Sequence, residues 1–258
     1  DTHLHTYNSP DAFLMQNRSA SPDDAYRFAK GEPIVHPYNR AKIQLDTPLD
    51  FLVVSDHGEA LGLLRKLFER DERLVDTAFG RFILAAAERG QEYQALTQRG
   101  GMTNQTRREG DPFDNRFGDQ VEPIREIAAD VWVETIEAAE RHNAPGEFTT
   151  FIGWEWTSAP GGANLHRVVF TPDGADFAKQ FYPYSTLDSS APEDLWNWLE
   201  KISQQAGGRF ISIPHNSNLS MGLMFDEVDF DGRPITAEYA RTRMKWEPIV
   251  EATQVKGD

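Results

Sequence analysis

Cysteine is absent from this chain of 258 residues. The sequence therefore excludes disulfide bonds and metal sites built on thiolates. A metal ion in this protein would have to be bound by histidine, aspartate or glutamate side chains. The chain has seven histidines and 41 acidic residues, so it offers such ligands in number.

Basic residues are scarce, with 26 Lys and Arg against 41 Asp and Glu and a formal net charge of −15. Nucleic acid and anionic membrane surfaces require a basic binding face, so the charge argues against both as main partners. Long apolar runs are missing too, and no segment approaches the ~18 apolar residues of a membrane span. We expect a small-molecule substrate as the partner; the sequence does not indicate an oligomeric state.

Apolar runs and amphipathic stretches alternate along the chain. The apolar runs predict strands at 49–55, 148–156, 165–171, 209–214 and 248–255. Apolar residues at helical spacing predict helices at 22–29, 59–70, 74–98, 121–142 and 193–206. This alternation predicts one α/β domain over residues 1–258 with a largely parallel sheet. The Gly-rich, charged stretch 99–119 predicts a flexible insertion in that domain.

Most of the histidines lie in or at the ends of predicted strands. Alternate residues of an extended segment point to one side, so the two histidines near the N-terminus would face one cavity. The C-terminal strand ends of a parallel α/β barrel converge on one face, which would bring the others to the same place. The candidate ligands are His3, His5, His57, His166 and His215, whereas His36 and His142 lie in loop or helix-end contexts and are expected to have no role.

Carboxylates accompany these histidines. Asp11 follows the first pair, Asp56 precedes His57, and Glu155 lies inside an apolar strand between two tryptophans. A carboxylate in a strand core is costly unless it is paired or binds a cation. Imidazole and carboxylate ligands without sulfur suit Zn²⁺, Mn²⁺ or Fe²⁺. Each histidine alone also has an ordinary interpretation, for example His215 shaping a turn, but Glu155 has few other partners.

Several segments have a distinctive wording: NRSASPDDAYRFAKGE, PLDFLVVSDHGE, FIGWEWTS, NLHRVVF, IPHNSNLSMGLMFD and WEPIVEATQVKGD. They resemble the bacterial family DUF3604 over essentially the whole chain. The order of the polar motifs, from the initial HLH through SDH at 55–57 to His215, is similar to that of the PHP (polymerase and histidinol phosphatase) metallohydrolases, which DUF3604 itself resembles.

The resemblance implies a distorted (β/α)7 barrel with a cluster of two or three divalent metal ions. By position, one ion would be bound by His3, His5 and Glu155, a second by His166 and His215 with Glu155 bridging, and a third by Asp11 and His57. The PHP pattern closes with an acid-x-His pair after the last strand. That pair would begin near Asp258, so we expect it, and the C-terminal part of the barrel, to be missing from the printed chain.

The resemblance also implies hydrolysis by a metal-activated water, first of all of a phosphoester, with Glu155, His57 and Asp56 as the catalytic residues. The candidates for substrate binding are the cations Arg18, Arg167 and Lys256 and the amides Asn216 and Asn218. Two alternatives stay open. Aromatic residues near the motifs (Trp154, Trp156, Phe225, Trp246) would suit a carboxylic ester or an amide, and a barrel without turnover would only bind metal or ligand.

Overall fold

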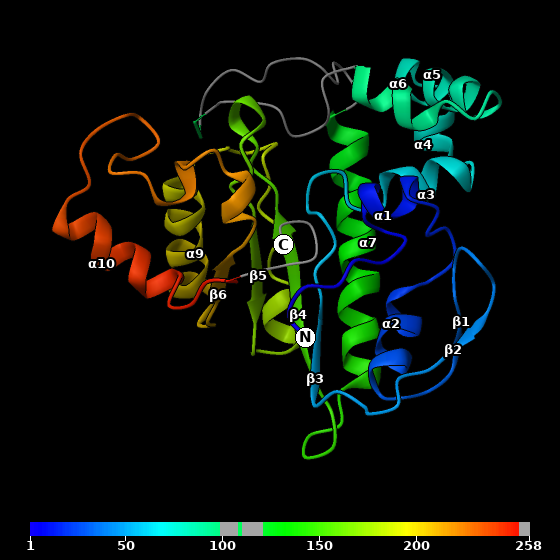
Figure 1. The fold of residues 1–258 in the computed structure, drawn as a ribbon, viewed down its shortest axis with the longest axis horizontal. Coiled ribbons are helices and arrows are strands. Elements are labelled where there is room, and N and C mark those ends of the chain that lie inside the picture. Colours follow the sequence, from blue (N-terminus) through cyan, green and yellow to red (C-terminus); the bar gives the residue numbers. More distant parts are fainter. Residues whose placement is uncertain (99–107, 110–120, 253–258) are drawn as a thin grey trace.

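The main sheet has four strands in the order β3-β4-β5-β6 (Figure 1). They are β3 (Phe51–Val54), β4 (Thr149–Trp156), β5 (Arg167–Thr171) and β6 (Ile211–Pro214). β3 and β4 are parallel, whereas β4 with β5 and β5 with β6 are antiparallel. The computed structural model describes residues 1–98, 108–109 and 121–252.

The predicted (β/α)7 barrel is wrong, because the strands of the described residues form an open mixed sheet and a separate two-stranded one. Among the described strands of this sheet, only β3 and β4 pair in parallel, and the connection between them contains several helices. β4 and β5 are joined by residues 157–166, which contain one 3₁₀ turn, η2 (Pro160–Gly162), and so short a connection reverses the chain. The predicted fifth strand is also wrong over 248–252, which lies outside any strand, and 253–255 lie outside the described residues.

One face of the sheet is covered by the two longest helices, α7 (Val121–His142) and α9 (Pro192–Ala206). Trp154 of β4 contacts Trp132 of α7 and Trp198 of α9, with ring centroids 5.8 Å apart in both pairs. The opposite face carries a smaller cluster of buried side chains, Val53, Val168, Phe170 and Ile213. Because side chains alternate along a strand, Glu155 and Trp154 point to opposite faces.

The other elements surround this sheet (Figure 1). The helices are α1 (Pro10–Leu14), α2 (Pro22–Ala29), α3 (Leu63–Phe68), α4 (Glu72–Val75), α5 (Ala78–Ala87), α6 (Glu92–Gln98), α8 (Ala175–Ala178) and α10 (Ala237–Trp246), and β1 (Ile34–Val35) pairs with β2 (Lys42–Ile43). Two further 3₁₀ turns are η3 (Ser217–Leu219) and η4 (Leu223–Phe225). None of the helices in the described ranges is both long and apolar enough to pass through a lipid bilayer.

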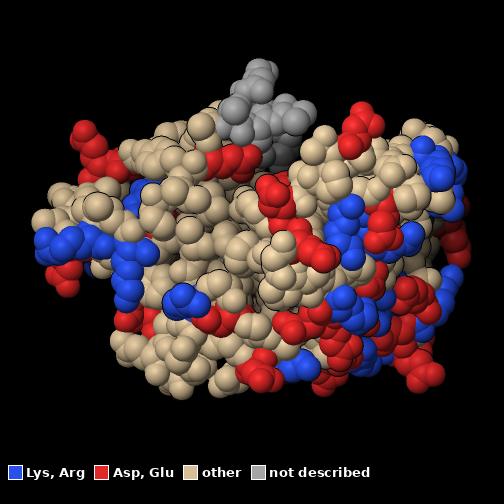
Figure 2. Space-filling model, turned by 90° about the horizontal axis from the view of Figure 1, so that it is seen from below, with Lys and Arg blue, Asp and Glu red and all other residues tan. Residues whose placement is uncertain are grey.

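Local sequence explains most helix boundaries. α2 begins with a capping box, in which Ser21 accepts from the Asp24 amide and the Asp24 carboxylate accepts from the Ser21 amide. The predicted helix 74–98 is instead three helices, because Thr77 caps α5 and Gly90, at φ 65°, turns the chain before α6. The predicted insertion lies outside the described residues except for Arg108 and Glu109. Figure 2 shows acidic and basic side chains interspersed over one face of the molecule.

Candidate metal centre

One edge of the sheet collects the predicted ligands. His57 follows β3, Glu155 lies near the end of β4, and His215 follows β6. β5 runs in the opposite direction, so its beginning lies at this same edge, and His166 directly precedes it. The convergence that we expected from a parallel barrel is therefore produced by an open mixed sheet.

The N-terminal segment brings two more histidines to this edge. Leu4 forms a parallel bridge with Val54 of β3, and alternation places the side chains of His3 and His5 together on the other side of the segment. The segment is held by Asp56, which is 2% exposed and accepts hydrogen bonds from the amide and the hydroxyl of Thr6, the latter at 2.6 Å. Asp56 thus positions the segment that carries these histidines.

Glu155 is the centre of the site, with a carboxylate that is 1% exposed. Its Oε2 lies 2.8 Å from Nε2 of His5 and 3.1 Å from Nε2 of His3. Its Oε1 lies 2.7 Å from Nδ1 of His166, 3.2 Å from Nε2 of His215 and 3.5 Å from Nδ1 of His57. All five histidines predicted as ligands therefore surround one buried carboxylate.

The grouping of the histidines around Glu155 can be compared with the ligand sets that the resemblance implied. His3 and His5 share one oxygen of Glu155, and His166 and His215 share the other, as in the predicted sets for two ions. The tightest groups of donor atoms, however, combine Glu155 with His3 and His215, and Glu155 with His5 and His57, each within 4.8 Å. The ring of His57 thus lies close to Glu155 as well as to Asp11.

Asp11 lies at the rim of the cluster. Its carboxylate is 3.2 Å from Nδ1 of His5 and 3.4 Å from Nε2 of His57. These contacts place it beside His57, as the resemblance implied, and also beside His5. Ser9 donates a hydrogen bond to Asp11 at 2.6 Å and so holds the carboxylate toward the two rings.

Burial and charge oppose each other in the pKa values of this cluster. Burial lowers the pKa of His5, but the carboxylates of Asp11 and Glu155 outweigh burial and raise it to about 10. Burial lowers the pKa of His215 to about 4 and also lowers that of His166, despite the neighbouring Glu155. Burial raises the pKa of Glu155, but the imidazoles that contact its carboxylate, His57 first among them, outweigh burial and hold this pKa well below its usual value, so Glu155 is ionised.

The donor atoms fit a divalent cation. Nδ1 of His166 and both ring nitrogens of His215 are buried and have no hydrogen-bond partner among the described residues. The low pKa values of His166 and His215 keep these rings neutral at neutral pH, so each ring can offer one nitrogen lone pair to a cation beside the ionised carboxylate. Nitrogen and oxygen donors of this kind suit Zn²⁺, Mn²⁺ or Fe²⁺.

Two residues that we did not predict contact ring nitrogens of the histidine cluster. Glu251 places Oε2 3.4 Å from Nδ1 of His3, and its own amide donates to the carbonyl of Pro214 at 3.0 Å. The hydroxyl of Thr157 contacts Nδ1 of His57. Thr157 lies two residues after Glu155, where strand spacing indicates the same side, whereas no sequence signal pointed to Glu251.

The predicted substrate-binding cations lie elsewhere or are not described. Arg18 pairs with Glu92, and Arg167 pairs with Glu247 at 2.9 Å on the helix-covered face of the sheet. Lys256 lies outside the described residues.

The predicted amides and aromatic residues differ in their exposure. Asn216, next to His215, is buried with both amide atoms lacking a partner among the described residues, and Asn218 is exposed. Of the aromatic candidates, Trp154, Trp156 and Trp246 are buried in the main core, whereas Phe225 is exposed. Neither His36, which accepts from two turn amides, nor His142, which pairs with Asp23, contacts the cluster.

The comparison with known families gives one match. The family described as "Protein of unknown function (DUF3604)" matches residues 1–258, so the resemblance to DUF3604 is confirmed. No curated protein and no solved structure matches the chain. These comparisons do not support the further likeness to PHP metallohydrolases.

Proposed function

We propose that the chain, which belongs to the DUF3604 family of proteins of unknown function, is a metal-dependent hydrolase that cleaves a phosphoester. The observation that carries the proposal is the surrounding of Glu155. Ring nitrogens of five histidines lie within 3.5 Å of a carboxylate that is 1% exposed. A buried charged cluster is often no more stabilising than an apolar residue in its place, so a bound cation explains the cluster better than a purely structural role.

The residues of the cluster have distinct roles in this proposal. Glu155 would bind divalent ions through its carboxylate, and the five histidines would complete the ligand sets. Asp11, at the rim, would bind alongside His5 and His57. Bound divalent ions supply a nucleophile from water at neutral pH and neutralise the charge that develops on the substrate. Asp56 contributes by holding the N-terminal segment.

A phosphoester is the substrate class that we favour. Its charge is matched by two or three divalent ions, and the order of the ligand motifs is similar to that of the PHP metallohydrolases, many of which cleave phosphoesters. The overall charge of −15 does not oppose this choice, because the ions reverse the sign locally.

One observation favours a carboxylic ester or an amide as the second candidate. No Lys or Arg in the described part of the chain forms a hydrogen bond or an ion pair with Glu155 or with the five histidines around it. A phosphate would therefore depend on the ions alone, whereas a neutral acyl group needs no further cation.

The experiment that tests the proposal separates metal binding from turnover. Chelator-treated protein is reloaded with Zn²⁺, Mn²⁺ or Fe²⁺ separately, and bound metal and hydrolysis are measured with p-nitrophenyl phosphate, bis-p-nitrophenyl phosphate, p-nitrophenyl acetate and a p-nitroanilide. Metal-dependent cleavage of a phosphate substrate is the expected result. Cleavage of only the acetate or anilide selects the second candidate, metal binding without turnover indicates a binding module, and failure to bind any of the metals overturns the proposal.

A further inference from the structure

A cavity of about 290 Å³ lies away from the candidate metal centre. Its walls include Arg167, which directly follows His166 but points to the opposite face of the sheet by strand alternation. The rest of the wall comes from η2 and the segment after it, from the beginning of α9, from the segment after His215 and from α10. The volume is at the lower end of the range for small-molecule sites.

The charges beneath this cavity do not balance. Glu247, 1% exposed, accepts from Nε of Arg167 at 2.9 Å and from Nε of Arg243 at 3.0 Å. Two guanidinium groups therefore share one carboxylate, and the trio has a net charge of +1. Trp196 donates to the same carboxylate at 2.8 Å, so Glu247 is held in place by three donors.

Arg243 is the cation with free donors. Only its Nε–H forms a hydrogen bond within the described residues, and its Nη2 is buried without a partner. The guanidinium lies over the ring of Phe225, with Cζ 4.9 Å from the ring centroid. Its other terminal nitrogen, Nη1, is not among the buried unpartnered atoms and forms no hydrogen bond within the described residues, so it can donate a charge-assisted hydrogen bond to an anion in the cavity.

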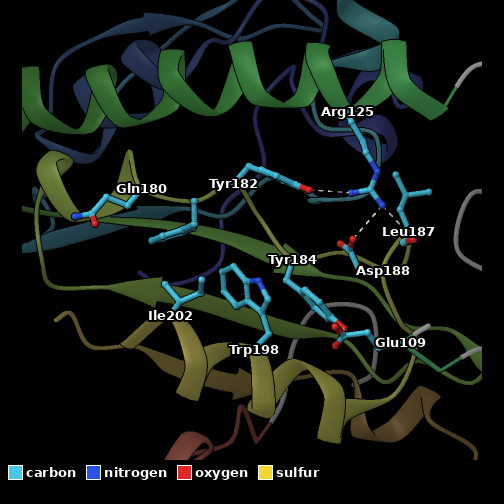
Figure 3. A pocket seen from close by; sticks show the side chains of 10 residues that line it. Glu109, Arg125, Gln180, Tyr182, Tyr184, Leu187, Asp188, Trp198 and Ile202 are labelled. Atoms are coloured by element: carbon cyan, nitrogen blue, oxygen red, sulfur yellow. Dashed lines mark hydrogen bonds and ion pairs between the residues drawn. The ribbon is translucent and has the colours of Figure 1, made fainter. Parts of the chain in front are cut away.

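A second cavity shows the contrast. It has a volume of about 470 Å³ and is lined by Arg125 together with aromatic side chains (Figure 3). There Nη1 of Arg125 donates to the hydroxyl of Tyr182, and its Nη2 donates to the carbonyl of Leu187 and to Asp188 (Figure 3). The protein itself satisfies the terminal donors of Arg125, as it does not for Arg243.

The remaining walls of the smaller cavity define its ligand. Tyr239 lines it with a hydroxyl that forms no hydrogen bond within the described residues, and burial raises the pKa of Tyr239 to about 12, so the hydroxyl is a neutral donor. Apolar side chains, among them Leu165, Leu223 and Met224, form much of the rest. A ligand would combine one anionic group with an apolar body.

Acidic residues around the cavity select a monoanion. Asp229 is paired with Arg233, and Glu193 accepts from the amide of Phe230, but Asp226 is exposed and has no ion pair with a described residue. A dianionic phosphate would be repelled more strongly than a singly charged carboxylate.

We propose that this cavity binds a small apolar monocarboxylate, with the carboxylate on Nη1 of Arg243 and on the hydroxyl of Tyr239. The site is independent of the metal centre and of the proposed hydrolase activity. The apolar body of the ligand packs against Leu223 and Met224.

The test uses 3-phenylpropionate as the probe and 3-phenylpropanamide as its neutral counterpart. Both are titrated into chelator-treated protein by calorimetry or by ligand-observed NMR, so that no metal ion binds the carboxylate. The acid is expected to bind about tenfold more tightly than the amide, because only the acid forms charge-assisted hydrogen bonds with Arg243. Inorganic phosphate is expected to compete weakly.

Variants locate the site. Arg243→Gln should remove the preference for the acid, and Tyr239→Phe should weaken acid binding about threefold, the loss of one hydrogen bond. Arg241→Gln, on the exposed side of the same helix, is the matched control and should bind as the parent does. Thermal denaturation verifies that each variant is folded. If the Arg243→Gln protein is unfolded, the affinity of the Tyr239→Phe protein for the acid tests the proposal instead.

Four outcomes overturn the proposal: no saturable binding of the acid, equal binding of acid and amide, tighter binding of phosphate than of the acid, or an equal effect of the Arg241 and Arg243 substitutions.

Discussion

Nδ1 of His166 lies 2.7 Å from Oε1 of Glu155, yet the two atoms do not form a hydrogen bond. The ring lies beside the carboxylate at ion-pair distance, while burial lowers the pKa of His166 and keeps it neutral. A divalent cation bound by the ring nitrogen and the carboxylate oxygen would account for this contact. The relationship supports the proposal that the histidine cluster binds metal.

The first prediction concerns Glu155→Gln. The substitution preserves shape and removes the negative charge that the donor sets share, so bound metal and metal-dependent hydrolysis should fall together, with metal affinity reduced by at least about 100-fold. Metal content by mass spectrometry and hydrolysis rates measure the effect. Glu147→Gln, an exposed glutamate in the turn before β4, is the matched control. Unchanged metal content in folded Glu155→Gln protein would show that Glu155 is not a ligand.

The second prediction distinguishes Asp56 from a catalytic residue. In Asp56→Asn, an amide NH₂ replaces one of the two oxygens that accept from Thr6, so one buried donor loses its acceptor. We expect a loss of about 1–3 kcal/mol in the free energy of unfolding. Metal affinity should fall as the N-terminal segment loosens, while the rate per bound metal stays near that of the parent protein. Denaturant unfolding and metal-saturated kinetics make the two measurements.

A large loss of rate at full metal occupancy, without a loss of stability, would instead make Asp56 catalytic. The structure favours the positioning role because its contacts are to Thr6, and both oxygens are used in them.

The candidate site was more predictable from the sequence than the fold. Alternation in HLH and a carboxylate inside an apolar strand are local patterns, and they correctly identified residues that meet around Glu155. The direction of β5 depends on how the loop 157–166 reverses the chain, which hydrophobic periodicity does not encode. A barrel was therefore expected where the described strands form an open sheet.

The substrate-binding candidates show a different limit of prediction from the sequence. Arg167 was chosen because it is near His166 in sequence, but neighbours in a strand point to opposite faces, and Arg167 pairs with Glu247 behind the sheet. Alternation alone was enough to exclude it from the metal centre. The contact between Glu251 and His3 joins residues at opposite ends of the chain and depends on the tertiary fold, so no local pattern predicts it.

The third prediction concerns this contact. Metal-binding histidines commonly donate a hydrogen bond from their second ring nitrogen to a carboxylate. This bond fixes the orientation of the ring and raises its basicity. Glu251→Gln should therefore weaken metal binding about tenfold without unfolding the protein. A competition titration with a chromophoric chelator measures the change. Glu227→Gln, an exposed glutamate of the same part of the chain, serves as the control and should match the parent protein. Equal affinities for the parent and Glu251→Gln would remove Glu251 from the site.

The last prediction follows from the charge of His5. The carboxylates of Asp11 and Glu155 raise its pKa to about 10 against the effect of burial, so His5 carries a proton at neutral pH in the metal-free protein. The pKa of His57 is raised as well, whereas the rings of His166 and His215 are already neutral. Metal binding must displace the proton of His5, so affinity should rise about tenfold for each pH unit between about pH 7 and 9 and flatten above the pKa of His5.

The pH dependence of the stability of the metal-free protein has the opposite sign to that of its metal affinity. Because the pKa of His5 is raised above its unfolded value, its contribution to the stability of the metal-free protein is complete below about pH 6.5 and is lost as the pH rises through about 10. Calorimetry in two buffers of different ionisation enthalpy measures the number of protons that metal binding releases. We expect at least one proton per protein chain that becomes fully loaded with metal. His5→Gln should release about one proton fewer, and His36→Gln, outside the cluster, should not differ from the parent. Metal binding that releases no proton and shows no pH dependence in this range would mean that His5 is not a ligand, because a ligand imidazole cannot keep its proton.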